Sequence, residues 1–283
     1  MRFAVVGGDE RSAILTELLS RDGHNVRSFA LEKARLCCET GCLQGCVYGA
    51  DCVILPVPAE KSGLLNCPLS DESMSLSELV SALWPEQTVL GGKLPRDICA
   101  QGQRENLYIK DFMSLPSFTM GNAVITAEGA LHCLMDSGKD SLWQSKMLIV
   151  GWGRIAKILA LRLMALGAKV CIAARSEEGL AMAEALGCKA VFLENLAEHV
   201  GDYEYIINTV PARVMDEALL CSAKSDTFLL ELASPPGGFD RNFAENIGLR
   251  ICYAPGLPGK YAPIAAAKLM QQAVYKIIAH WEE

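Results

Sequence analysis

Apolar residues along the chain follow two kinds of spacing, and each kind predicts a different element. Short continuous apolar runs, such as residues 3–6 and 147–150, are typical of strands that are buried on both faces. Between them apolar residues recur every three or four positions, as at Ile14, Leu15 and Leu18, which is the spacing of an amphipathic helix. Regular alternation of the two kinds predicts an α/β fold with parallel sheets and helices on their faces.

Two such series follow one another along the chain. The first has predicted strands at 3–6, 25–29, 50–56, 88–92 and 106–110, with helices at 14–19 and 76–83. The second has predicted strands at 146–150, 169–174, 190–192, 205–210, 227–232 and 250–253, with helices at 155–166 and 180–186. A helix at 123–136 leads from the first series to the second. We therefore expect two Rossmann-like domains, and 283 residues suit two domains of ordinary size.

The chain closes with a predicted helix that carries one apolar stripe. The stripe contains Met270, Ala273, Val274, Ile277, Ile278 and Trp281. A partner protein is one place for it to pack, but long apolar stripes usually belong to the core of their own chain, so we expect it on the first domain. The predicted domains are therefore residues 1–125, completed by the helix 262–283, and residues 126–261.

Composition narrows the class of protein. Hydrophobic residues make up 51% of the chain, which provides apolar surface for two cores. A net charge of −7 disfavours nonspecific binding to nucleic acid or anionic membranes. The apolar stretches fall short of the roughly 18 residues that a membrane span requires, and the N-terminus lacks the layout of a signal peptide. We expect a cytoplasmic protein with no membrane or nucleic-acid partner.

Twelve cysteines raise the question of a metal site or of disulfides. In a long, core-rich chain without a secretion signal we expect reduced thiols that behave as small hydrophobes. The closest-spaced group contains Cys37, Cys38, Cys42 and Cys46. This group has no CxxC knuckle, and Gly41 and Gly45 interrupt the helix that would align its thiols. We expect no metal site, although the spacing leaves the oxidation state of this group open.

The strongest chemical signal follows the first strand of the second series. Gly151, Gly153 and Ala156 give the G-x-G-x-x-A form of the dinucleotide-binding fingerprint. The first glycine permits a tight turn, the second lets backbone approach a pyrophosphate, and the alanine allows close packing of helix on strand. The helix that starts with Arg154 and Ile155 presents free N–H groups to the phosphates. Its place between a strand and a helix favours a dinucleotide site over a plain turn.

The end of the next strand favours NADP over NAD. Enzymes that bind NAD usually carry Asp or Glu there, which bonds the ribose 2′-hydroxyl. This strand instead ends with Ala174, Arg175 and Ser176, and an arginine fork with a hydroxyl suits a 2′-phosphate. A solvated arginine on a surface turn is the alternative. Later strand ends should line the same crevice, and they add the predicted cofactor contacts Asn208, Thr209, Val210, Pro211, Ala233 and Ser234.

Further motifs run in order along the whole chain. They are Gly7-Gly8-Asp9-x-Arg11, Leu55-Pro56-Val57-Pro58, Asn122 with Thr126-Ala127-Glu128-Gly129-Ala130, the fingerprint, Ala174-Arg175-Ser176 and Pro255-Gly256-Leu257-Pro258-Gly259. Together they resemble the family of dipicolinate synthase A subunits, and the T-A-E-G-A and P-G-L-P-G motifs are the more specific of them. The chain departs from the family's pattern at Ala156, where members often carry Gly, and at Lys260-Tyr261, where apolar residues are expected.

The resemblance implies a fold similar to that of the 2-hydroxyacid and alanine dehydrogenases, with the C-terminal helix completing the first domain. It implies an NADP-dependent oxidoreductase that converts 4-hydroxy-tetrahydrodipicolinate, or its dehydrated form, to dipicolinate. It also implies a flavoprotein-like B subunit as partner, in sporulating bacteria or their relatives. The substrate would be a small dicarboxylate drawn from the lysine pathway. We further expect a homo-oligomer.

A dicarboxylate substrate needs cationic or N–H donors. Gly7 and Gly8 head the first helix, whose N-terminus attracts a carboxylate, and Arg11 follows in its first turn. The remaining candidates are Asn122 for substrate binding, Thr126 and Lys260 for catalysis, and Glu128 as the general base. A hydrogen-bond acceptor on a helix surface is the alternative role for the glutamate.

Two other functions stay open. A 2-hydroxy or 2-amino acid dehydrogenase usually needs a His oriented by a carboxylate. The 2-hydroxyacid enzymes also carry an Arg after the fifth strand of the cofactor domain, and here residues 232–235 supply none. Residues 255–263 contain no His, and His24, His132, His199 and His280 lie elsewhere. An NADP-binding regulatory protein without activity fits the lack of an obvious acid–base pair.

Overall fold

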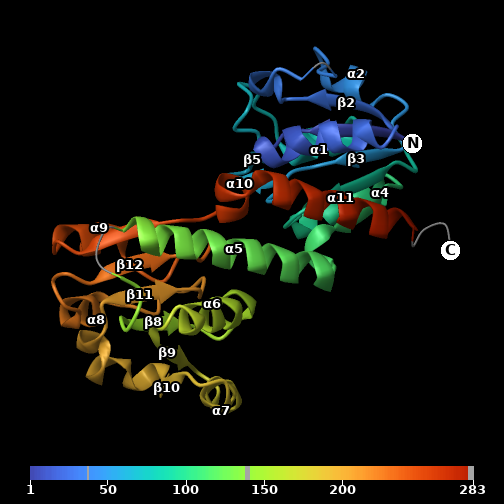
Figure 1. Ribbon diagram of the computed structural model, residues 1–283. Coiled ribbons are helices and arrows are strands. Elements are labelled where there is room, and N and C mark those ends of the chain that lie inside the picture. Colours follow the sequence, from blue (N-terminus) through green and yellow to red (C-terminus); the bar gives the residue numbers. More distant parts are fainter. Residues whose placement is uncertain (37, 138–140, 280–283) are drawn as a thin grey trace. The chain divides into compact units, whose positions relative to one another are not determined.

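The computed structural model describes residues 1–36, 38–137 and 141–279 (Figure 1). Contacts between residues divide the chain into two units. Unit 1 contains Met1–Asn122 and the C-terminal segment from Pro258, and unit 2 contains Ala123–Leu257. Each unit has its own parallel sheet with helices against it. The prediction of two α/β units with parallel sheets is confirmed.

Unit 1 is built on a five-stranded parallel sheet in the order β2-β1-β3-β6-β7. The strands are β1 (Arg2–Val6), β2 (Asn25–Phe29), β3 (Cys52–Ile54), β6 (Thr88–Gly91) and β7 (Tyr108–Asp111). Residues 3–6 are all buried, because elements cover both faces of a sheet of this kind. The strand order reverses between β1 and β3, and ligands of open α/β sheets bind at the carboxyl ends of strands at such a point.

The connections of unit 1 contain the predicted helices at 14–19 and 76–83 together with elements that the sequence patterns did not predict. The helices are α1 (Glu10–Arg21), η1 (Glu32–Ala34), α2 (Leu43–Val47), α3 (Leu76–Ser81), α4 (Arg96–Arg104) and η2 (Phe112–Ser114), and a hairpin joins β4 (Glu60–Lys61) to β5 (Leu64–Leu65). The prediction that Gly45 interrupts a helix was wrong, because α2 runs through it. Cys42 caps this short helix, since its Sγ accepts from the Gly45 N–H at 3.4 Å.

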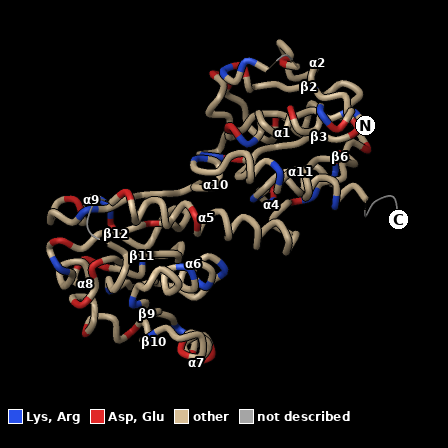
Figure 2. Tube along the Cα trace, in the orientation of Figure 1, with Lys and Arg blue, Asp and Glu red and all other residues tan. Residues whose placement is uncertain are grey.

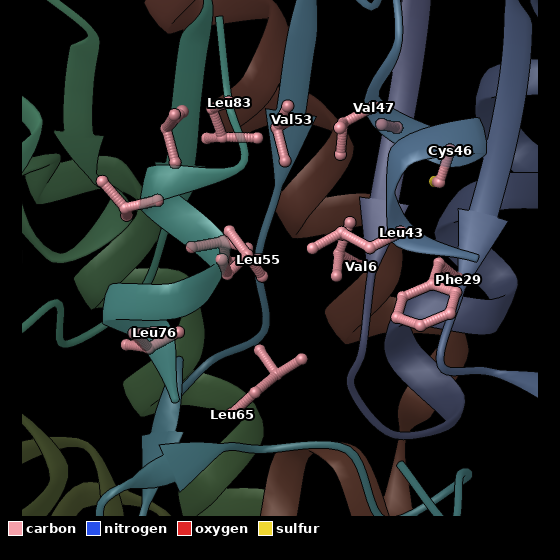
Figure 3. Close-up of a cluster of buried hydrophobic side chains, with 14 of the residues drawn as sticks. Val6, Phe29, Leu43, Cys46, Val47, Val53, Leu55, Leu65, Leu76 and Leu83 are labelled. Carbon is pink, nitrogen blue, oxygen red and sulfur yellow. The ribbon is translucent and has the colours of Figure 1, made fainter. Parts of the chain in front are cut away.

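One face of the unit 1 sheet packs against α2 and α3. Val6, Val53 and Leu55 point from the strands and their ends toward Val47 of α2 and Leu76 of α3 (Figure 3). These side chains are almost fully buried. Burying such a cluster is the main force that holds the short helices onto the sheet, since a five-residue helix is not stable by itself.

The other face of the sheet packs against α1 and the C-terminal helix α11 (Pro263–Ala279), which lie side by side (Figure 1). The buried residues of α11 include Met270, Ala273, Val274 and Ile277, and Ile278 packs partly buried against the same cluster. They meet Phe3 of β1 and Leu15 of α1. The prediction that the C-terminal helix packs on the first domain is confirmed, and Trp281 of the predicted stripe lies outside the described residues.

A polar contact also fastens α11 to the end of α1. The Tyr275 hydroxyl donates to Asp22 Oδ2 at 2.5 Å, and Gln271 Nε2 donates to the same oxygen at 2.8 Å. Burial, and then the hydrogen bond to Asp22, raises the pKa of Tyr275 to about 12. The folded protein therefore holds this proton more tightly than the unfolded chain, whose tyrosine pKa is about 10.

We predict that Tyr275→Phe lowers the free energy of unfolding by about 1 kcal/mol near neutral pH. Because the folded pKa is the higher one, the contribution of the phenol is complete below a pH of about 10 and is lost as pH rises toward about 12. Urea unfolding of both proteins across this range should show the difference between them shrinking. Tyr48→Phe, at an exposed tyrosine, is the control. A difference that stays constant with pH would contradict the prediction.

Unit 2 is built on a six-stranded parallel sheet in the order β10-β9-β8-β11-β12-β13. The strands are β8 (Lys146–Val150), β9 (Lys169–Ala174), β10 (Lys189–Phe192), β11 (Tyr205–Asn208), β12 (Phe228–Glu231) and β13 (Arg250–Tyr253). With β8 counted as the first strand, this is the 3-2-1-4-5-6 order of dinucleotide-binding domains, and the order reverses between β8 and β11. The fingerprint residues follow β8 and thus stand at the reversal.

The helices of unit 2 cover this sheet. They are α6 (Arg154–Ala165), α7 (Glu177–Ala185), η3 (Leu193–Glu198), η4 (Val200–Asp202), α8 (Glu217–Ser222) and α9 (Arg241–Asn246), and α5 (Pro116–Asp136) and α10 (Leu257–Tyr261) each run from one unit into the other. Basic and acidic residues are interspersed along the described part of both units (Figure 2). Among these residues, none of the helices has the length and apolar character that crossing a bilayer requires.

Candidate functional site

The fingerprint forms the turn between β8 and α6. Gly151 has φ +102°, a conformation that residues with a side chain rarely adopt. A Cβ at this position would lie 2.5 Å from Thr209 Oγ1 and 2.8 Å from Val210 Cγ2, so the turn packs against the end of β11. Gly153 caps α6 with extended backbone, and a Cβ there would meet nothing within 4 Å. The N-terminus of α6 is therefore open to a ligand.

A cavity of about 530 Å³ lies beside this turn. Five of the predicted cofactor residues line it, namely Gly151, Ala174, Arg175, Ser176 and Val210. Residues that the sequence analysis did not single out also line it, including Trp152, Lys157, Glu178 and Gly179. A volume of this size, at the carboxyl ends of parallel strands, suits one half of a dinucleotide.

The charged rim of the cavity comes from the first turns of α6 and α7 and from the residues between β9 and α7. Arg175 and Lys157 are exposed, and neither forms an ion pair with a carboxylate among the described residues. Ser176 caps α7, since its Oγ accepts from the Gly179 N–H at 3.2 Å, and its own hydroxyl hydrogen remains available as a donor. Glu178, in the first turn of α7, also lines the cavity. The rim thus carries two cations and one carboxylate.

One polar atom of a residue that lines the cavity lacks a partner. Trp152 Nε1 is buried, and it is the only buried side-chain nitrogen or oxygen without a hydrogen bond in the described part of the chain. Buried donors in native proteins almost always have an acceptor, so an orphan of this kind calls for an explanation. A nucleotide brings phosphate and hydroxyl oxygens that accept hydrogen bonds. The residues present therefore fit a dinucleotide.

The side chain of Asn208 bonds within the protein. Its Nδ2 donates to Glu231 Oε1 at 2.6 Å and to the Val210 carbonyl at 2.9 Å, and its Oδ1 accepts from the Val210 N–H at 3.1 Å. All of the hydrogen atoms of this fully buried amide are used within the protein. Contact of Asn208 with a cofactor stays a prediction, and it would have to involve groups other than these two amide hydrogen atoms. The amide holds the loop that follows β11.

Glu231, at the end of β12, is the residue that sequence reasoning missed here. Its carboxylate is 1% exposed. Oε1 also accepts from the Ala233 N–H at 2.9 Å, and Oε2 accepts from the N–H groups of Gly238 and Phe239 at 2.7 and 3.3 Å. The carboxylate thus ties the loop after β12 to the loop after β11. The sequence did offer one indication of this role, because a glutamate at the end of an apolar strand is a carboxylate that needs partners when the strand is buried.

The other predicted cofactor residues lie around this network. Thr209 is used within the protein, because its Oγ1 donates to the Val150 carbonyl at 2.9 Å. Ala233 is buried, and its N–H donates to the Glu231 carboxylate. Pro211 and Ser234 are exposed on the loops after β11 and β12. Arg154 and Ile155 begin α6 directly after the capping glycine.

The predicted carboxylate site at Gly7 and Gly8 already holds a carboxylate. Asp9 caps α1 and accepts from the Arg11 N–H at 3.1 Å. The buried Arg11 guanidinium donates to both oxygens of Asp9 at 2.8 Å and to the Val57 carbonyl. A Cβ on Gly259 would lie 2.6 Å from Asp9 Oδ2, so this turn packs against the end of the P-G-L-P-G motif. Substrate binding by Arg11 stays a prediction, and the ion pair with Asp9 means that a substrate carboxylate would compete with that side chain.

The predicted catalytic residues are not gathered around one reacting centre by the contacts seen within each unit. Glu128 lies exposed on α5 in an ion pair with Arg162 of α6 at 3.2 Å, which supports the alternative role of a surface acceptor. Thr126 is buried on the same helix. Lys260 is exposed on α10, with its ammonium 5.3 Å from the ring centre of Tyr261. Asn122 is half-buried where unit 1 ends in α5.

Histidine and cysteine contribute little to the sites described so far. His24 packs between Phe3 and Tyr275, His132 lies on α5, and His199 follows η3, while His280 is outside the described residues. Across residues 1–36, 38–137 and 141–279, no three side chains of His, Cys, Asp or Glu form a metal-binding group.

The three described cysteines of the predicted group have separate surroundings. Cys38 is half-buried with its Sγ 3.5 Å from Ser28 Oγ, Cys42 is exposed as a helix cap, and Cys46 is buried. Burial raises the pKa of the Cys46 thiol to about 12, so it stays protonated. Cys37 lies outside the described residues.

Comparison with known proteins identifies two segments of the chain. Residues 2–113 match the family model of the N-terminal domain of the dipicolinate synthase A subunit. Residues 146–233 match a family model described as NADP oxidoreductase, coenzyme F420-dependent. The first segment lies in unit 1, and the second contains the fingerprint turn, the cavity and the Glu231 network.

Relatives of the whole chain agree with these segments. The dipicolinate synthase A subunit of Bacillus subtilis is 28% identical over 99% of this chain and 96% of its own. The crystal structure of the A subunit from Bacillus halodurans has a TM-score of 0.84 at 25% identity, covering 98% of this chain and 97% of that one. The crystal structure of the A subunit from Bacillus subtilis has the same TM-score and identity, and the match covers 100% of this chain and 98% of that one.

The fold itself is shared more widely. L-alanine dehydrogenase has a TM-score of 0.61 at 15% identity, covering 98% of this chain and 89% of that one. D-lactate dehydrogenase from Escherichia coli has a TM-score of 0.69 at 13% identity, covering 100% of this chain and 97% of that one. The predicted similarity to the 2-hydroxyacid and alanine dehydrogenase fold is confirmed. Residues 2–113 thus match the N-terminal domain of the dipicolinate synthase A subunit, unit 2 carries an oxidoreductase domain of the nicotinamide-nucleotide type, and the whole chain is similar to that A subunit.

Proposed function

We propose that the chain is the NADP-dependent oxidoreductase component of a dipicolinate synthase. The observation that carries the cofactor assignment is Arg175, which follows β9 where NAD enzymes usually place a carboxylate. Its guanidinium lines the cavity and has no acidic partner among the described residues. An unpaired arginine beside the ribose position favours a 2′-phosphate, because its fork matches two phosphate oxygens.

The remaining parts of the cofactor have matching positions in unit 2. The N–H groups at the start of α6, behind Gly151 and Gly153, would hold the pyrophosphate. Arg175 and the Ser176 hydroxyl would hold the 2′-phosphate. The loops after β11 and β12, which the Glu231 carboxylate fixes, stand at the carboxyl ends of strands where the nicotinamide half of a dinucleotide binds in such sheets.

The position of Glu178 beside the cavity is the one observation that favours NAD as the cofactor. Its carboxylate lines the same cavity and is of the kind that bonds a ribose 2′-hydroxyl. It stands in the first turn of α7 rather than at the tip of β9, and two cations share the rim with it. Because the summed charge of these three side chains is positive, a doubly charged phosphate is the better match.

The proposed reaction forms an aromatic ring. Loss of water from 4-hydroxy-tetrahydrodipicolinate gives dihydrodipicolinate, and removal of a hydride and a proton from that ring gives dipicolinate. Bound NADP supplies the chemistry of a hydride acceptor. Aromatisation makes the departing proton acidic, so water is a sufficient acceptor and a strongly basic side chain is not required. Glu128 is accordingly left out of the proposed chemistry, because Arg162 pairs with it.

Binding of the dicarboxylate is proposed for residues of two helices. Lys260 on α10 is an exposed cation without an acidic partner among the described residues, and its ammonium would pair with one carboxylate. Asn122, which like Lys260 belongs to unit 1, would orient the ring by a hydrogen bond, and Thr126 of unit 2 is proposed as a separate hydrogen-bonding residue. We also propose a flavoprotein-like B subunit as partner, since the relatives are named as A subunits, and self-association of the chain.

A turnover assay tests this function. Purified protein, NADP and freshly generated 4-hydroxy-tetrahydrodipicolinate are mixed with and without the B subunit, and NADPH absorbance and dipicolinate are measured together. We expect one NADPH for each dipicolinate, and a requirement for the B subunit would place part of the chemistry on the partner. Dipicolinate that forms without NADPH, or tight cofactor binding with no product in either mixture, would contradict the proposal and favour a regulatory protein.

A further inference from the structure

The wall of the cavity contains a pair of side chains that the fingerprint does not require. Trp152 occupies the variable position between Gly151 and Gly153, and Lys157 lies one turn into α6. The Lys157 ammonium lies over the indole, 5.8 Å from its ring centre, within the range of a cation–π contact. Both side chains line the cavity together with Arg175 and Ser176.

The geometry of Gly179 shows where the indole edge lies. A Cβ on this glycine would be 3.2 Å from Trp152 Cδ1 and 2.8 Å from Ser176 Oγ. The indole edge that carries Cδ1, and beside it the N–H, is therefore close to the first turn of α7. This is the turn that Arg175 and Ser176 precede, and the absence of a side chain on Gly179 makes room for the indole there.

We propose that Trp152 and Lys157 form a second recognition element for the 2′-phosphate of NADP, beside Arg175 and Ser176. The inference rests on the proposed use of NADP. The Trp152 N–H is a donor without an acceptor, and Lys157 is a cation without a carboxylate partner among the described residues. A phosphate monoester has the three terminal oxygens and the double negative charge that satisfy both. The single 2′-hydroxyl of NAD offers neither the charge nor enough acceptors.

The proposal includes a local rearrangement. Trp152 Nε1 has almost no contact with solvent in the described conformation, so a phosphate oxygen reaches it only after a neighbouring group moves. The exposed Lys157 ammonium lies over the face of the indole and not in its plane, so it can turn to the phosphate while a separate shift at the ring edge opens the N–H. Movement of the ammonium from the ring to the phosphate changes the surroundings of the indole. Tryptophan emission should therefore report the 2′-phosphate.

Calorimetric titration with NADP and NAD tests the two side chains separately. Trp152→Phe keeps an aromatic ring and removes the N–H, and Lys157→Gln removes the charge. Each change should weaken NADP about tenfold and leave NAD unchanged. Trp143→Phe, at an exposed tryptophan, and Lys169→Gln, at the opposite end of β9 from Arg175, are matched controls that should alter neither affinity.

A second measurement follows the tryptophan emission of the unaltered protein, so its main result does not depend on the folding of a variant. Adenosine 2′,5′-bisphosphate should change the tryptophan emission, adenosine 5′-monophosphate should not, and Trp152→Phe should abolish the response. Equal loss of NADP and NAD affinity, or no loss of either, overturns the inference. If the unaltered protein prefers NADP and only Arg175→Gln removes that preference, the role of Trp152 and Lys157 is wrong while the assignment of NADP still holds. If the unaltered protein has no preference, the proposed cofactor fails first.

Discussion

Glu231→Ala should lower the free energy of unfolding by about 3–5 kcal/mol, the largest stability loss that we expect from a single change in unit 2. The buried carboxylate accepts from Asn208 Nδ2 and from the backbone N–H groups of Ala233, Gly238 and Phe239. Alanine removes both acceptor oxygens at once. Burial of N–H groups without acceptors carries a large cost in free energy, and the loops after β11 and β12 lose the group that joins them.

Glu231→Gln should also be destabilising, although it preserves the shape. Each carboxylate oxygen faces two N–H donors, so an amide NH₂ at either position confronts donors rather than acceptors. Urea unfolding of both variants measures the effect, with Glu217→Gln at an exposed position of α8 as the control. Glutamine as stable as the unaltered protein would show that the charge of Glu231 does not hold the loops together.

Arg175→Gln should weaken NADP binding by about 10- to 100-fold and leave NAD binding unchanged, which corresponds to about 1.4–2.8 kcal/mol. The guanidinium is exposed at the rim of the cavity and has no acidic partner among the described residues, so its loss frees no buried carboxylate. The effect should therefore appear in binding and not in stability. Arg241→Gln on α9, where the arginine pairs with Glu245, is the matched control.

Glu178→Gln separates the two cofactor assignments. If NADP is the cofactor, removing this carboxylate from the rim should strengthen NADP binding, because it removes repulsion. If NAD is the cofactor and Glu178 bonds its ribose, the same change should weaken NAD binding. An Arg175→Gln protein that loses affinity for both nucleotides equally would show that the arginine contacts a part that the two share.

The sheets could be predicted because their strands are continuous apolar runs. Residues 3–6 and 147–150 are buried on both faces, and this leaves an unmistakable pattern in the sequence. The fingerprint was predictable for a related reason, since a glycine at position 151 meets both a steric and a conformational demand. The C-terminal helix was predictable from its stripe.

Other features had weak local signals because tertiary contacts create them. The helix α2 contains Gly45 and is held by the burial of Leu43 and Val47. The first turns of α5 contain Pro116, Ser117 and Gly121, which are typical of a loop, although a proline is also common in the first turn of a helix. Local propensity does not predict elements that are stabilised mainly by packing.

Two predicted site residues have partners within the protein that their sequence positions did not indicate. Arg11 and Asn208 have the chemistry of ligand-binding groups, but each has partners within the protein that come from elsewhere in the chain, Val57 for the first and Glu231 for the second. Sequence spacing does not show that a polar group is already satisfied. Arg175, by contrast, was predicted to face a ligand and has no described acidic partner.

The most direct test of the account is calorimetric titration of the unaltered protein with NADP and with NAD under the same conditions. Two cations, a serine hydroxyl and an orphan indole N–H around one cavity predict that NADP binds at least about tenfold more tightly than NAD, with a preference that weakens as salt is added. NAD binding as tightly as NADP, or more tightly, would contradict the account and assign the cavity to a ribose bonded by Glu178.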